Sequence, residues 1–252
     1  MKINKFKKIG TNKYKLFLDN NSIIVYEDVI LKYNLLYKKD IDDELLIKIN
    51  EDNYKASIYD TALKYIGVRM RSKKELEEYL FRKKFDNKDI KDTIDKLLCQ
   101  GFLNDKVFCK SYVNDKIHLT NSGLGKIRYE LIKLGIDENT INSTIESVDD
   151  SILDEKLDKI IKKEIRINSK LPINKMKNKI VNKCINLGYK LEDINEILDS
   201  SIISITSNIE EDYNKLYSKY SSKYDEYKLK SVLKSKLYQK GYTLDEINSL
   251  VK

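Results

Sequence analysis

Apolar residues recur at the same positions in four successive segments of the chain. When Lys84, Gly135, Gly188 and Gly241 are aligned, they lie 51, 53 and 53 residues apart. Spacings of four residues place apolar side chains on one face of a helix. The pattern therefore predicts a tandem repeat in which a helix ends at the aligned residue, here called the turn residue, and another follows. The residues that occupy the same position in all four repeats are here called a column, and each column is numbered by its distance from the turn residue. The columns are Leu76, Ile127, Ile180 and Leu233 at −8; Leu80, Leu131, Cys184 and Leu237 at −4; Phe85, Ile136, Tyr189 and Tyr242 at +1; Ile90, Ile141, Ile194 and Ile247 at +6; and Ile94, Ile145, Leu198 and Val251 at +10.

Each repeat is expected to contain three helices. A further apolar-periodic segment precedes each helix pair, as TALKYI, FCKSYV, LDKIIKKEI and YNKLYSKY. Glycine at three of the four turn residues suits the left-handed conformation that commonly ends a helix. Because one such unit buries a small core, neighbours should stack into an elongated array. We expect repeats at residues 54–104, 105–150, 151–207 and 208–252, the last beginning with a helix at roughly 208–222.

The first 53 residues follow a different pattern and form a separate head. KYKLFLDNNSIIVYED predicts two short strands around a turn at residues 19–22. Two short helices should follow, in VILKYNLLYKKD and IDDELLIKIN, the second beginning at Asp42 or Asp43. The expected fold is therefore mainly α, with tandem three-helix repeats and a small N-terminal β-hairpin and helix head.

The composition narrows the functional classes. The 252 residues include one proline and eight glycines, and 35% are charged, which favours helices with short connections. The spacing of the three cysteines and the single histidine does not suit metal ligands; these residues are Cys99, Cys109, Cys184 and His118. We place His118 in a loop. We therefore expect no metal, no cofactor and no enzyme active site. The N-terminus has no apolar run, and no stretch approaches the length that spans a bilayer. We expect a cytoplasmic protein that does not enter membranes.

Arginine is rare, although the formal net charge is +8, and its placement is therefore informative. Ser72 and Glu75 form an S-x-x-E capping box for the middle helix of the first repeat, and Glu78 can pair with Arg82. Arg69 and Arg71 precede this cap, where the helix dipole is unfavourable for cations. They serve either local salt bridges or a surface that binds an acidic partner. The five arginines are Arg69, Arg71, Arg82, Arg128 and Arg166.

Three stretches, RMRSKKELEEYL, LLCQGFLNDKVFCKSYV and GLGKIRYELIKLGI, resemble the bacterial regulatory protein family RecX, in the longer form found in low-GC Gram-positive bacteria. The resemblance covers roughly residues 56 to 148, whereas the two later repeats carry fewer of the family's residues. The residues that carry it are Arg69, Arg71, Ser72, Glu75, Leu76, Gly101, Phe102, Leu103, Asp105, Gly123, Ile127, Glu130 and Leu131.

The resemblance implies tandem three-helix repeats and a partner, the RecA recombinase filament on DNA. Members of the family bind that filament and restrain its assembly, ATP hydrolysis and strand exchange, in homologous recombination, DNA repair and the SOS response. Under this hypothesis the protein acts as a monomer. The residues expected to contact RecA or DNA are Arg69, Arg71, Lys73, Lys74, Arg82, Lys83 and Arg128.

A general, non-sequence-specific DNA-binding protein is the alternative hypothesis. Positive charge lies mainly on the middle helices, whereas the third helices are neutral or acidic. A helix-turn-helix reader would need basic side chains on its last helix, so this distribution favours phosphate contacts or an acidic protein groove. The tyrosines before the last middle helix either stack on bases or pack a long helix: Tyr213, Tyr217, Tyr220, Tyr224 and Tyr227.

Overall fold

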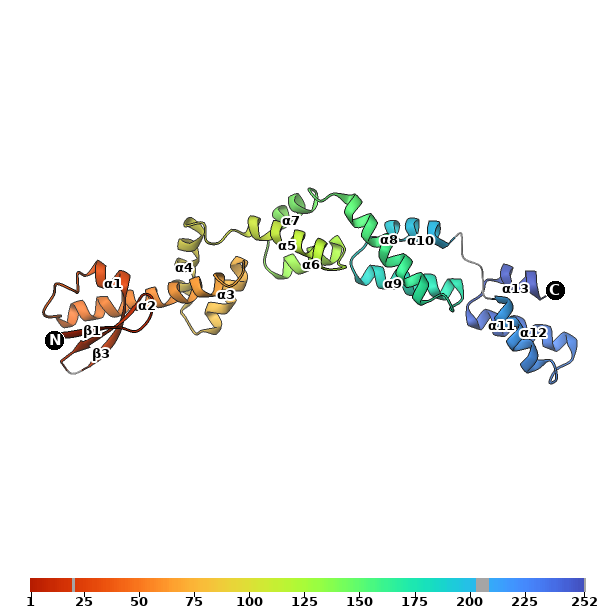
Figure 1. The fold of residues 1–252 in the computed structure, drawn as a ribbon, viewed down its shortest axis with the longest axis horizontal. Helices are drawn as coiled ribbons and strands as arrows, with labels where there is room; N and C mark the ends of the chain where they lie inside the picture. Colours follow the sequence, from red (N-terminus) through yellow and green to blue (C-terminus); the bar gives the residue numbers. More distant parts are fainter. Residues whose placement is uncertain (20, 203–208, 252) are drawn as a thin grey trace. The chain divides into compact units, whose positions relative to one another are not determined.

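The computed structural model describes residues 1–19, 21–202 and 209–251, which form a three-stranded sheet and thirteen helices (Figure 1). These residues divide into two compact units, Met1–Cys109 with Leu134–Ile136, and Lys110–Lys133 with Asp137–Lys252. In the described ranges no helix combines the length and the apolar character needed to cross a bilayer.

The strands are β1 (Ile3–Lys8), β2 (Lys13–Leu18) and β3 (Ser22–Tyr26). The helices are α1 (Glu27–Lys32), α2 (Asp43–Ile66), α3 (Lys73–Arg82), α4 (Asn87–Cys99), α5 (Asp105–Leu119), α6 (Leu124–Lys133), α7 (Glu138–Ile145), α8 (Asp150–Ile167), α9 (Ile173–Asn186), α10 (Leu191–Ile202), α11 (Ile209–Tyr220), α12 (Glu226–Lys240) and α13 (Leu244–Leu250).

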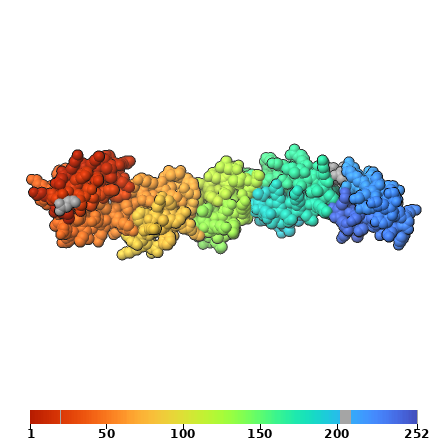
Figure 2. Space-filling view, turned by 90° about the horizontal axis from the view of Figure 1, so that it is seen from below, coloured from red at the N-terminus to blue at the C-terminus, as the bar shows by residue number. Residues whose placement is uncertain are grey.

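The head contains three antiparallel strands in the order β1-β2-β3, one more than the sequence predicted. Leu16 and Val25 of the sheet pack with Val29 of α1 and Ile49 of α2 in one buried cluster. In the space-filling view, the head and the start of α2 form one continuous surface, red to orange (Figure 2). The predicted hairpin is confirmed, and β1 completes the sheet.

The prediction of a separate short helix before the first repeat is wrong, because α2 runs without a break from the head into that repeat. Asp42 caps its start, as expected, by accepting a hydrogen bond from the backbone N–H of Leu45. Near the middle of α2, Asn53 accepts from the N–H of Tyr26 at 3.0 Å and donates to the carbonyl of Ile24 at 2.9 Å. The expected boundary between residues 53 and 54 therefore lies inside a helix that is held by the sheet.

The four repeats have the helix order that the columns predicted. All residues of the five columns are buried except Phe85 and Ile145, which are partly buried. The turn residues are all left-handed, with φ of 65° at Lys84, 79° at Gly135, 91° at Gly188 and 108° at Gly241. The prediction of three-helix repeats with a small strand-containing head is thus confirmed.

Two local expectations are corrected. His118 lies in the last turn of α5 and not in a loop, because no helix breaker precedes Thr120, whose hydroxyl donates to the carbonyl of Lys116. Arg82 donates from Nε to the backbone carbonyl of Glu78 at 3.3 Å, so it contacts the backbone of Glu78 and not its carboxylate. At the start of the last repeat, Tyr213 packs against the core, which accounts for one of the clustered tyrosines.

Candidate functional site

The start of α3 positions the first of the predicted contact residues. Ser72 accepts from the N–H of Glu75, and the Glu75 carboxylate accepts from the N–H of Ser72, which completes the predicted capping box. The same carboxylate binds Arg69, with Nη2 to Oε1 at 2.6 Å. Burial would raise the pKa of Glu75, but the hydrogen bonds from Arg69 and Ser72 outweigh it and lower the pKa. Arg69 is thus held in place while 53% of its side chain is exposed.

Arg71 has a different environment, because only 15% of its side chain is exposed. Its guanidinium lies 4.2 Å from the centre of the Tyr65 ring, and that ring stacks on Tyr79 at 3.9 Å. Nη1 of Arg71 reaches the Glu75 carboxylate at 3.3 Å. A guanidinium stacks well on an aromatic face, which an ammonium does less effectively. The geometry therefore favours a positioning role for Arg71, and contact through Arg69 stays a prediction.

The remaining candidates on α3 lie at its two ends. Lys73 and Lys74 are exposed in the first turn, and the backbone N–H of Lys73 donates to the Asp105 carboxylate at 2.9 Å. Arg82 and Lys83 are exposed at the opposite end, where positive charge is favourable beside the helix C-terminus. With Arg69, these side chains give α3 a basic surface at both ends.

Arg128 belongs to the other compact unit, and it lies on α6. Its guanidinium donates to the side-chain oxygen of Asn142 on α7. Lys126 and Arg128 line a hollow of about 900 Å³ between the second and third repeats, together with Asp150 and Asp154 of α8. The carboxylates in this hollow offset part of its positive charge. Arg128 is thus only partly available to a partner.

Successive repeats meet through the middle helices, at junctions that the sequence did not predict. The hydroxyl of Ser72 donates to the carbonyl of Leu134 at 2.7 Å, and Lys74 covers Gly135. In the next junction the N–H groups of Gly123 and Gly125 donate to the carbonyls of Leu187 and Gly188, at 2.7 and 2.9 Å. In the third, the Lys175 ammonium donates to the carbonyl of Gln239 at 3.1 Å, and its side chain covers Gly241. In each case the start of one middle helix binds free carbonyls at the end of the next, which satisfies groups that a helix end leaves unpaired.

These junctions explain why glycine stands at three turn residues and lysine at the first. A Cβ atom at Gly135, Gly188 or Gly241 would come within 3.0 Å of Lys74, Lys126 or Lys175, respectively. Lys84 has the same left-handed conformation but belongs to the first repeat, which no repeat precedes. Glycine is therefore required where another repeat approaches, as well as for its freedom at positive φ. The glycine at position 123, where the first repeat has a capping serine, was the signal in the sequence.

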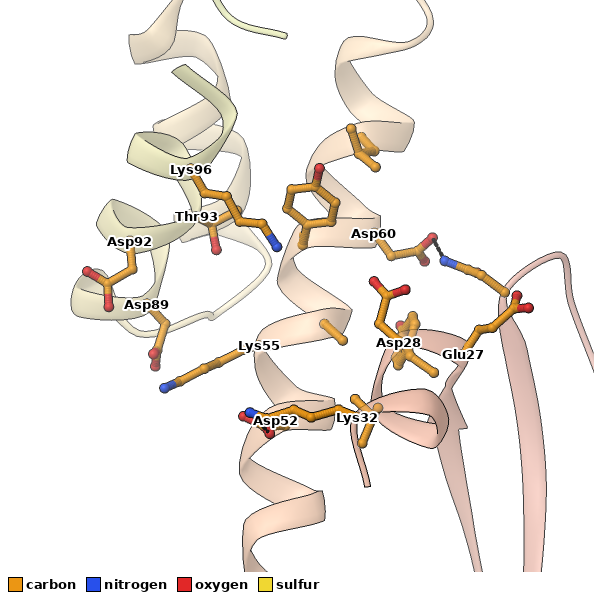
Figure 3. A pocket seen from close by; sticks show the side chains of 16 residues that line it. Glu27, Asp28, Lys32, Asp52, Lys55, Asp60, Asp89, Asp92, Thr93 and Lys96 are labelled. Atoms are coloured by element: carbon orange, nitrogen blue, oxygen red, sulfur yellow. Dashed lines mark hydrogen bonds and ion pairs between the residues drawn. The ribbon is translucent and has the colours of Figure 1, made fainter. Parts of the chain in front are cut away.

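A second hollow, of about 400 Å³, lies between the head, α2 and α4, and many charged side chains line it (Figure 3). Asp60 binds Lys13 at 3.2 Å and Lys64 at 2.8 Å, and Asp52 binds Lys32 at 2.5 Å. Burial would raise the pKa of Asp60, but hydrogen bonds from Lys64, Lys13 and Asn12 lower it. The pairs with Lys13 and Lys32 fasten the head to α2, the pair with Lys64 lies within α2, and the lowered pKa values keep both carboxylates ionised.

All three cysteines are thiols, of which Cys99 is exposed and the other two are buried. Cys184 is buried in the core of the third repeat, and burial raises the pKa of its thiol to about 11, so the reactive thiolate is disfavoured. Within residues 1–19, 21–202 and 209–251, no three His, Cys, Asp or Glu side chains gather as metal ligands.

Comparison with known proteins identifies the family. The family models for the first and second three-helix domains of RecX match residues 59–97 and 104–145. The regulatory protein RecX of Clostridium tetani is 30% identical over 148 residues, which cover 56% of this chain and 67% of that protein. The chain belongs to the RecX family. Regulatory protein RecX of Bacillus subtilis is 30% identical over 135 residues, or 53% of this chain and 51% of that protein. The match thus spans about half the length of the first curated relatives.

Solved RecX structures share the fold. A crystal structure of regulatory protein RecX superposes with a TM-score of 0.66 at 22% identity, covering 79% of this chain and 98% of that one. The crystal structure of RecX from Lactobacillus salivarius gives a TM-score of 0.56 at 26% identity, covering 59% of this chain and 97% of that one. The Arg69 and Glu75 pair lies inside the stretch that the first RecX domain model matches.

Proposed function

We propose that this RecX-family protein binds the RecA recombinase filament on DNA and restrains its assembly, ATP hydrolysis and strand exchange. The observation that carries the proposal is the exposed guanidinium of Arg69, held by Glu75 within the first RecX domain. A guanidinium fixed by one carboxylate still presents donors to a second carboxylate or to a phosphate. The name of the relatives, regulatory protein RecX, supports a regulatory role and not a catalytic one.

In the mechanism we propose, successive repeats of one monomer contact successive subunits of the filament. Such contacts oppose the addition of subunits or the conformational cycle coupled to ATP hydrolysis. Several weak contacts on one chain act together, because each one raises the effective concentration of the next. The proposed setting is homologous recombination, DNA repair and the SOS response in the cytoplasm.

Direct binding to DNA is the second candidate. The net charge of +8 and the exposed lysines of the middle helices favour contacts with phosphates. Under this alternative the protein would inhibit RecA only by occupying DNA, and it would need no contact with the recombinase.

Binding of the labelled protein to a preassembled RecA filament and to bare single-stranded DNA, at the same salt concentration, separates the two candidates. We expect tighter binding to the filament, and we expect Arg69→Ala to weaken it about 10-fold, as loss of one charge-assisted hydrogen bond would. Lys91→Ala, an exposed charge on α4, serves as the matched control and should change binding less than about twofold. Equal binding to filament and bare DNA would favour the DNA-binding candidate.

A further inference from the structure

One column of exposed apolar residues accompanies the buried columns. Three residues before each turn residue, the middle helices carry Phe81, Ile132, Ile185 and Tyr238, here called the outer column. These side chains are 61%, 45%, 45% and 61% exposed, respectively. Single exposed apolar residues are ordinary on protein surfaces. The same register in all four repeats, exposed every time, needs an explanation of its own.

The buried cores of the repeats do not include the outer column, although Ile185 also lines the hollow between the second and third repeats. The core of each middle helix is supplied by the columns at −8 and −4, which are buried in all four repeats. One residue further along a helix, a side chain points about 100° away from the core position. Isoleucine, phenylalanine and tyrosine are also poorer helix formers than lysine, glutamine or glutamate at an exposed site. Neither the core nor the helix therefore selects these side chains.

The neighbouring column shows that the composition of the chain does not account for the pattern. The next residues, Arg82, Lys133, Asn186 and Gln239, are polar in all four repeats. Each of them carries N–H donors and two carry positive charge, so every apolar side chain of the outer column is bordered by a hydrogen-bond donor. The complementary surface is an apolar depression with an acidic or carbonyl-rich rim.

The residue types also discriminate between classes of partner. Aromatic side chains stack on bases, but the aliphatic Ile132 and Ile185 do not, and neither binds phosphate. Single-stranded DNA therefore fits only half of the outer column. A protein that presents the same apolar depression on each of many identical subunits fits all four positions.

We propose that the outer column is a docking row for a polymer of identical protein subunits, in which each repeat inserts one apolar side chain into an acidic-rimmed depression of the polymer. This inference rests on the proposed function, because the filament is the polymer, and it adds the side chains through which the repeats bind. Four equivalent contacts on one chain bind through avidity, so their losses multiply.

The test replaces the outer column by glutamine, as Phe81→Gln, Ile132→Gln, Ile185→Gln and Tyr238→Gln in one chain. Each change should weaken binding to the RecA filament about three- to fivefold, since a half-exposed apolar side chain gains about half of a full burial. The quadruple variant should therefore lose roughly 100-fold or more, while binding to bare single-stranded DNA changes less than about twofold. The control replaces four exposed apolar residues outside the column, Leu31, Ile47, Leu119 and Leu244, by glutamine, and should bind as the wild type does.

The outcomes are distinct. If the wild type binds the filament and the quadruple variant binds it equally well, the docking row is wrong and the proposed function stands. If the quadruple variant loses DNA binding to the same extent, the row contacts DNA and the inference is also wrong. If the wild type does not bind the filament, the docking row and the proposed function are both wrong. Should the quadruple variant lose helicity, the pair Phe81→Gln with Tyr238→Gln decides in its place, with an expected loss of about 10- to 25-fold.

Discussion

Gly188→Ala tests whether the junctions between middle helices stabilise the repeats. The added Cβ atom would fall on the backbone nitrogen of Lys126 and lie 2.7 Å from its Cβ atom. Backbone must therefore move, and the movement breaks the hydrogen bonds from Gly123 to Leu187 and from Gly125 to Gly188. Each bond contributes about 1 kcal/mol, and the left-handed conformation of alanine costs about 1 kcal/mol more. The expected loss is about 3 kcal/mol of unfolding free energy, or roughly 6–12 °C in the thermal midpoint.

Gly101→Ala is the matched control, because Gly101 has a φ of 76° and an added Cβ would meet no described residue within 4 Å apart from its two neighbours in the chain. This variant should lose only the conformational contribution of about 1 kcal/mol. Thermal and urea unfolding followed by far-ultraviolet circular dichroism compare the two variants directly. Equal losses in both would show that the junction contributes nothing and would refute the reasoning.

Three further predictions concern the first repeat. Lys84→Gly should raise the unfolding free energy by about 0.5–1 kcal/mol in urea denaturation, because glycine adopts the left-handed turn without strain; a loss of stability would contradict this. Arg71→Ala should lower the free energy of unfolding by about 2 kcal/mol in the same assay, because the ring stacking and the ion pair are lost. Arg69→Ala should lower it by less than about 1 kcal/mol. Equal losses would mean that both side chains are structural. Since the folded pKa of Glu75 lies below its ordinary value of 4.5, its stabilisation is present above that pH and is lost as the pH falls through the folded pKa. Glu75→Gln should therefore flatten the acid limb of the stability curve, and an unchanged limb would contradict the assignment.

The repeats could be predicted because their cores are local. Each repeat buries residues that lie close together in the sequence, so that columns such as Leu80 and its equivalents at −4 record the packing directly. The capping box of Ser72 and Glu75 was predictable for the same reason, since both partners lie within one helical turn.

The features that were missed depend on partners distant in the sequence. Asn53 competes with helix formation in isolation, but its amide binds the backbone of Ile24 and Tyr26, and α2 continues through it. The residues of β1, Ile3 to Lys8, show weak alternation of apolar and polar side chains, because the strand lies at the edge of the sheet and is little buried. The pattern of residues along the chain shows neither the contacts of Asn53 nor the pairing of β1 with β2.

The candidate site, too, could be predicted only in part from the sequence. Sequence reasoning identified Arg69 and Arg71 as unusual, but only the structure separates an exposed guanidinium from one stacked on Tyr65. The junction role of Gly188 was hidden, because a helix end alone already accounts for glycine at that position. The exposure of Phe81 and its equivalents emerged only from the structure, although the apolar columns beside them were predicted from the sequence.

The most direct test of the central claim is the rate of ATP hydrolysis by RecA on single-stranded DNA while this protein is titrated in, with its own DNA binding recorded at the same salt concentration. We predict inhibition at substoichiometric protein, below the concentration at which the protein binds bare DNA. Inhibition that only follows DNA binding, or no inhibition at all, would contradict the account.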